Sequence, residues 1–108
     1  MDFKEYQEKA LKTKAYGAGD KITYPALGLG DEAGEVLGKV KKVLRDNNGE
    51  FTEDLCRQIG DECGDVLWYI SALCDDLNIS MQDVAENNIK KVEDRNKRGV
   101  IHGSGDYR

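Results

Sequence analysis

Residues 30–37 read GDEAGEVL, and residues 60–67 repeat this stretch as GDECGDVL. Each copy places two carboxylates three residues apart, a spacing that puts both on one face of an α-helix. Each copy also contains an interior glycine, which costs a helix about 1 kcal/mol relative to alanine and usually marks a close approach. The repeat therefore predicts two helices whose carboxylates together cage a divalent cation. The four carboxylates are Glu32, Glu35, Glu62 and Asp65.

The composition is typical of a soluble, helix-rich domain. The chain has 108 residues, of which 39% are apolar and 34% charged, with a single proline. A net charge of −5 argues against a nucleic-acid surface, because neutralising phosphates requires a basic face. The sequence contains no apolar run of about 18 residues and no apolar signal region at its N-terminus. We therefore expect a cytoplasmic protein that binds neither nucleic acid nor membrane.

Apolar residues recur at helical spacing in four segments of the chain. We expect helices over residues 3–16, 25–46, 53–77 and 81–97. Thr52 and Ser80 are the predicted N-caps of the third and fourth helices. Residues 97–108 lack periodicity and are expected to form an irregular C-terminal arm. The sequence thus predicts one all-α domain over residues 1–108.

One of the four carboxylates is expected inside the apolar face of its helix. At 100° per residue, Glu62 falls between Ile59 and Val66, and ionised side chains are almost never buried without a partner. Glu62 is therefore expected to need the metal as its only partner. We predict that Glu62→Gln abolishes activity yet leaves the fold intact or improves it.

Ligation by carboxylates alone suits Mg²⁺, with Mn²⁺ as a substitute. Zinc does not fit, because His102 is the only histidine and lies in the arm. Such a metal supports hydrolysis of a phosphoanhydride, with a carboxylate accepting the proton of the attacking water. The groups available for the more distant phosphates are Lys42, Asn88, Lys91 and Arg95. Other basic residues of the second helix, Lys39, Lys41 and Arg45, are expected to be solvated.

At these carboxylates the sequence resembles the MazG-like nucleoside triphosphate pyrophosphohydrolases, an all-α family in which E-x-x-E is followed by E-x-x-D. Here 26 residues separate the two halves. The surroundings are similar too, with YPALGL at residues 24–29 and GDVLWY at residues 64–69. The arm, which reads RGVIHGSGD over residues 98–106, looks like that of small phage and bacterial members. The likeness covers nearly the whole chain.

The resemblance implies hydrolysis between the α and β phosphates, which gives a nucleoside monophosphate and pyrophosphate. It implies that Glu32, Glu35, Glu62 and Asp65 hold Mg²⁺. It also implies a four- to five-helix bundle that assembles as a homodimer or homotetramer, so that another subunit completes the site.

Several functions stay open on the sequence alone. The first is a pyrophosphohydrolase that removes surplus or damaged nucleotides. The second is a related dUTP diphosphatase or phosphoribosyl-ATP pyrophosphohydrolase, and the third a non-catalytic regulatory oligomer that binds nucleotides. The aromatic pair Trp68 and Tyr69 is compatible with either base stacking or a place in the helical core.

Overall fold

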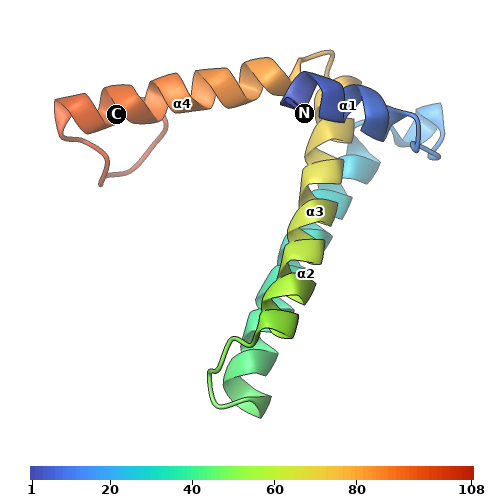
Figure 1. The fold of residues 1–108 in the computed structure, drawn as a ribbon. Helices are drawn as coiled ribbons and strands as arrows, with labels where there is room; N and C mark the ends of the chain where they lie inside the picture. The colour runs from blue at the N-terminus through green and yellow to red at the C-terminus, as the bar shows by residue number, and fades with distance from the viewer.

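The computed structural model describes all 108 residues and consists of helices without any strand (Figure 1). The α-helices are α1 (Phe3–Leu11), α2 (Thr23–Asp46), α3 (Glu53–Asp76) and α4 (Met81–Arg98), and a short 3₁₀ turn, η1 (Ala18–Asp20), lies between α1 and α2. The prediction of an all-α chain is confirmed. None of the helices combines the length and the apolar character that a membrane crossing needs.

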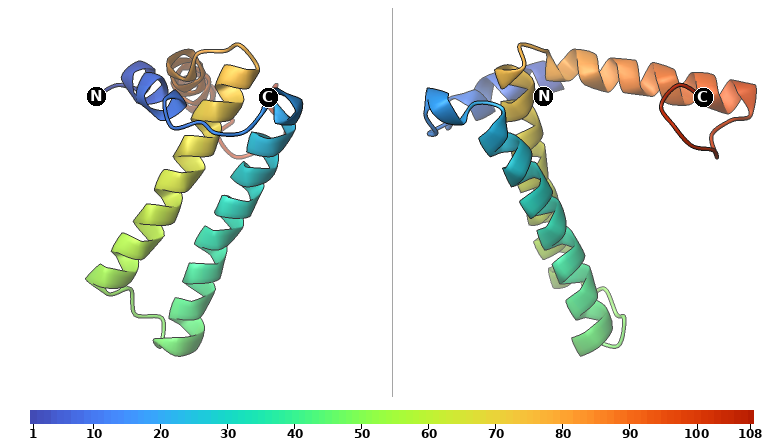
Figure 2. Two further views of the ribbon diagram at one scale, coloured as in Figure 1. Left: turned by 90° about the vertical axis from the view of Figure 1, so that its right-hand side faces the viewer. Right: turned by 180° about the vertical axis from the view of Figure 1, so that it is seen from behind.

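The two longest helices form an antiparallel hairpin, and the other two helices meet at its open end. α2 and α3 have 24 residues each and run side by side along their lengths (Figure 2). α1 crosses the end of the hairpin where α3 finishes and α2 begins, and α4 points away from it. The molecule is therefore L-shaped, with extents of 43 × 43 × 27 Å.

Local capping sets most of the helix boundaries. The Thr52 hydroxyl accepts a hydrogen bond from the Leu55 amide at 3.2 Å, and the Ser80 hydroxyl accepts one from the Asp83 amide at 3.2 Å. α4 ends at Arg98 and is capped by Gly99, whose φ of 72° lies in the left-handed region that glycine adopts freely. Both predicted N-caps are thus confirmed, because capping depends only on residues within one turn.

The first helix ends at Leu11, so the expectation of a helix to residue 16 is wrong. Beyond it the chain reaches Asp76, whose side chain is fully buried at the end of α3. The Asp76 carboxylate accepts hydrogen bonds from the Tyr16 hydroxyl at 2.8 Å, from the Ile22 amide at 2.9 Å and from the Lys14 ammonium. To reach Asp76 with these donors, the chain must leave the helical path of α1 after Leu11. α2 then starts at Thr23, two residues earlier than expected.

The direction of α4 is set by hydrogen bonds at its N-terminal end. The Gln7 side chain of α1 donates to the Ser71 carbonyl of α3 at 3.2 Å and accepts from the Met81 amide of α4 at 3.1 Å. The Gln82 side chain accepts from the Phe3 amide at 2.9 Å. α4 is therefore fixed to α1 and to the end of α3, and it does not lie along the hairpin.

Packing within one chain is incomplete. Only 9 of 108 residues are buried, and the accessible surface is 7656 Å², whereas a compact monomer of 12.1 kDa has about 6,000 Å². The radius of gyration is 16.6 Å, against about 13 Å for a compact domain of this length. The open shape leaves apolar side chains of α2 and α4 in solvent, among them Leu27, Leu37, Leu44 and Ile89.

Candidate metal centre

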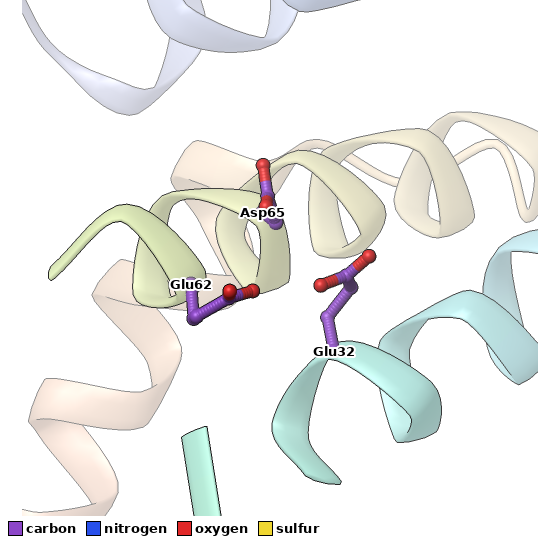
Figure 3. A group of neighbouring side chains, drawn as sticks. All are labelled: Glu32, Glu62 and Asp65. Carbon is purple, nitrogen blue, oxygen red and sulfur yellow. The ribbon is translucent and has the colours of Figure 1, made fainter. Parts of the chain in front are cut away.

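The hairpin brings three of the four predicted carboxylates together. Glu32 comes from α2, and Glu62 and Asp65 come from α3. One carboxylate oxygen of each lies within 4.8 Å of the others, and Glu32 points toward the two acids of α3 (Figure 3). Because α2 and α3 are antiparallel, the two octapeptide copies face each other across the hairpin, and the repeat thereby produces an acidic group.

Glu35 is not part of this group of three. It is exposed on the turn of α2 that follows Glu32. Its assignment as a metal ligand remains a prediction.

Glu62 has a protein partner that the sequence did not reveal. The Lys39 ammonium lies 3.7 Å from a carboxylate oxygen of Glu62, with the two side chains 32% and 18% exposed. Lys39 follows Glu32 by seven residues, which places both on one face of α2. The expectations that Lys39 is solvated and that Glu62 has no protein partner are both wrong.

The electrostatics of the group favour a divalent cation. Partial desolvation, and then the neighbouring carboxylates of Glu62 and Asp65, raise the pKa of Glu32 above its usual range. Lys39 is the one basic side chain that pairs with the group, so three carboxylates face a single positive charge. A donor set made only of carboxylate oxygens is the kind that hard ions such as Mg²⁺ and Mn²⁺ prefer. These residues therefore fit such an ion.

Comparison with known proteins identifies the family of this chain. Residues 24–100, which include all three acids, match the family described as MazG nucleotide pyrophosphohydrolase domain. The chain belongs to the MazG family. It is also similar to the Gene 37 protein of Mycobacterium phage L5, with 42% identity over 109 residues that cover 95% of this chain and 96% of the phage protein. No solved structure matches it. Membership of the MazG family indicates a hydrolase that acts on nucleotides.

Aromatic side chains of this MazG domain line two cavities near the start of α2. Tyr69 and Tyr24 have ring centroids 6.2 Å apart, and Tyr69 packs edge-on against Trp68 at 5.0 Å. A cavity of about 250 Å³ lies between these rings and Tyr16, and one of about 310 Å³ lies between Tyr24, Tyr69 and Asp31. Asp31, which lines the second cavity, directly precedes Glu32 in the chain.

The basic residues of α4 hold the C-terminal arm of the MazG chain. The Lys91 ammonium donates to the Asp106 carboxylate at 3.3 Å, and Arg95, whose side chain is 8% exposed, lies 3.5 Å from the same carboxylate oxygen. Arg95 also donates to the Asp106 carbonyl. Residues 100–108 form no helix, but α4 extends to Arg98, so the arm starts later than the predicted residue 97. His102 is exposed.

The predicted phosphate-binding residues of α4 lie apart from the acids within one chain. Lys42 is exposed on α2, and Asn88 is exposed on α4 beside Lys91. Since α4 projects away from the hairpin (Figure 1), it carries its polar residues away from Glu32 and Glu62. Their roles in binding substrate remain predictions.

Proposed function

We propose that this MazG-family protein hydrolyses nucleoside triphosphates between the α and β phosphates, releasing a nucleoside monophosphate and pyrophosphate. The observation that carries this proposal is the convergence of Glu32, Glu62 and Asp65 within 4.8 Å, inside the segment that matches the nucleotide pyrophosphohydrolase family. A role in clearing surplus or damaged nucleotides from the pool is consistent with such a reaction.

The proposed ligands of Mg²⁺, or of Mn²⁺ as a substitute, are Glu32, Glu62 and Asp65, with Glu35 as a fourth. When bound, such an ion neutralises charge that develops on the phosphate oxygens and makes water more acidic. A carboxylate oxygen of the group that does not bind the ion accepts the proton of the attacking water. The acids therefore combine metal binding with general-base catalysis.

The aromatic cavities beside the acids are the proposed site of the nucleobase. A planar base can stack on Tyr24 or Tyr69 while its triphosphate extends toward Glu32, because Asp31 at the cavity edge is adjacent to that residue. The cavity of about 310 Å³ lies at the lower end of the size range of small-molecule sites, and the cavity of about 250 Å³ lies just below that range.

We propose that a second copy of the chain completes the site, in a homodimer or homotetramer. Lys42, Asn88, Lys91 and Arg95 would then bind the phosphates, those of α4 being supplied across the interface. The accessible surface of 7656 Å² exceeds that of a compact monomer by about 1,600 Å², more than the roughly 800 Å² that one partner buries in a standard interface. Leu37 of α2, 72% exposed, is an apolar contact available to such a partner.

The test is pyrophosphate release from a panel of canonical and modified nucleoside triphosphates, with and without Mg²⁺, with products separated by chromatography. We expect monophosphate and pyrophosphate only with Mg²⁺, and none from Glu62→Gln. The matched control is Asp61→Asn, which changes an exposed neighbour outside the acidic group and should retain activity.

The other outcomes distinguish the alternatives. Release of orthophosphate and a diphosphate would mean that a different anhydride is cleaved. Turnover of dUTP or phosphoribosyl-ATP alone would identify one of the related hydrolases. Mg²⁺-dependent nucleotide binding without turnover of any compound would identify the protein as a regulatory nucleotide-binding oligomer and not as an enzyme.

A further inference from the structure

Lys39 is the one basic residue of α2 that pairs with the acidic group. Its ammonium lies 3.7 Å from Glu62, whereas Arg45 pairs with its neighbour Asp46. Lys41 is exposed and forms no salt bridge. The position of Lys39 follows from helical geometry, since a spacing of seven residues repeats the face that carries Glu32.

We infer that Lys39 is a built-in counter-cation of the acidic group and competes with the divalent cation for Glu62. This inference rests on the proposed function, because it assigns Lys39 a role at the same metal centre. In the metal-free protein the ammonium offsets part of the charge of three carboxylates that lie within 4.8 Å of one another. Without such an offset, these like charges repel each other at short range.

A divalent cation at Glu62 would lie close to the Lys39 ammonium. Two cations near the same carboxylate repel each other, so each weakens the binding of the other to Glu62. The lysine side chain is 32% exposed and has a flexible four-carbon stem, which gives the ammonium a path into solvent. Lys39 and the metal therefore compete for the Glu62 carboxylate.

Because Lys39 competes with the cation for Glu62, its presence weakens metal binding. Removing its charge should tighten Mg²⁺ binding, because no protein cation then has to be displaced. The same change should destabilise the metal-free protein, because Glu62 loses its partner. A lysine with a merely structural role would not tighten metal binding when it is removed.

The experiment titrates Mg²⁺ by calorimetry into the full-length chain and into Lys39→Met at low ionic strength, where screening is weak. The dissociation constant should fall roughly two- to fivefold in Lys39→Met, the range typical of a partly exposed ion pair. The melting temperature in the presence of a chelator should fall by a few degrees, and Mg²⁺ should raise it by more than in the wild type. Lys39→Arg, which keeps the charge, should restore wild-type behaviour, and Lys41→Met should match the wild type.

A double-mutant cycle assigns the effect to the Glu62 contact. In the chelator, Lys39→Met should lower the melting temperature of the wild type but not that of Glu62→Gln. Unchanged or weaker Mg²⁺ binding in Lys39→Met, with binding intact in the wild type, would overturn the inference. A wild type that neither binds Mg²⁺ nor hydrolyses any nucleotide would instead overturn the proposed function, and the cycle would still test the Lys39–Glu62 pair.

Discussion

The ring of Tyr69 in α3 lies directly against the backbone of Gly28 in α2. A Cβ atom at residue 28 would lie 2.5 Å from both Cδ1 and Cζ of this ring, closer than side chains tolerate. Gly28 is one turn before Glu32, and Tyr69 is one turn after Asp65. The contact that brings the two helices close therefore also sets the separation of the carboxylates.

Replacement of Gly28 by alanine should destabilise the hairpin. Alanine improves helix propensity by about 1 kcal/mol, but the added methyl must displace a rigid ring held between two helices, and overpacking of this kind costs about 1–3 kcal/mol. We expect a net loss of stability in urea unfolding and weaker Mg²⁺ binding, because displacement of Tyr69 separates Glu32 from Asp65.

The control is Gly34→Ala, at a glycine of the same helix whose added Cβ would meet no atom within 4 Å. This variant should be more stable than the wild type by up to about 1 kcal/mol. If the two alanine variants showed equal stability, the packing of Tyr69 on Gly28 would not limit the approach of the helices.

Acidification should weaken, in a defined pH range, the packing of the segment before α2 on the end of α3, which the hydrogen bonds to Asp76 hold together. Burial alone would raise the pKa of Asp76, but the Lys14 ammonium, the Ile22 amide and the Tyr16 hydroxyl outweigh it and lower the pKa to about 2. Since the folded pKa lies below the unfolded value of about 3.9, the stabilisation is complete above pH 4. It should be lost as the pH falls toward 2, and it amounts to about 2–3 kcal/mol.

Urea unfolding of the wild type and of Asp76→Asn between pH 6 and pH 2 measures this contribution. The asparagine variant should be less stable at pH 6, and the difference between the two proteins should shrink as the pH falls toward 2. A difference that stays constant over this range would show that ionisation of Asp76 does not stabilise this packing.

The four predicted metal ligands should differ in their effect on Mg²⁺ affinity. Glu32 belongs to the group of three converging acids and Glu35 does not. We therefore expect Glu32→Gln to weaken binding at least about tenfold, since loss of even an outer-shell partner of a metal ligand costs about that much, and Glu35→Gln to weaken it less. Calorimetric titration of both variants provides the comparison. An equal or larger loss in Glu35→Gln would mean that the metal is held by a different set of oxygens.

Much of the fold could be predicted because it is decided locally. The N-caps at Thr52 and Ser80 depend on residues within one turn, and the structure confirms them. The end of α1 could not be predicted, because it is determined by Asp76, more than 60 residues further along the chain. The direction of α4 likewise depends on Gln7, 74 residues before the Met81 amide that it binds.

The site could be predicted only in part for a related reason. A spacing of three residues places Glu32 and Glu35 on one side of α2, but it does not say which of them turns toward α3. That rotation is fixed by the close approach at Gly28, a tertiary contact. Lys39 was missed because a row of lysines at the C-terminal half of a helix fits solvation equally well. Its spacing of seven residues from Glu32 was the available signal.

Removal of the Asp106 charge should free the basic residues of α4. Lys91 and Arg95 share this carboxylate in the arm, and Lys91 is the main cause of the lowered pKa of Asp106. If these two cations bind substrate phosphates, as we propose, then Asp106 competes with the phosphates for them. Asp106→Asn should therefore bind pyrophosphate roughly two- to fivefold more tightly, the range expected for an exposed ion pair, in a calorimetric titration.

Tyr107→Ala is the matched control, because Tyr107 is fully exposed in the same arm and forms no hydrogen bond with either cation. It should leave pyrophosphate binding unchanged. Hydrogen exchange should also show faster exchange of the amides of residues 100–108 in Asp106→Asn, because the arm loses its contact with Lys91 while the bond from Arg95 to the Asp106 carbonyl remains. Faster exchange without tighter pyrophosphate binding would show that Lys91 and Arg95 anchor the arm and do not contact phosphate.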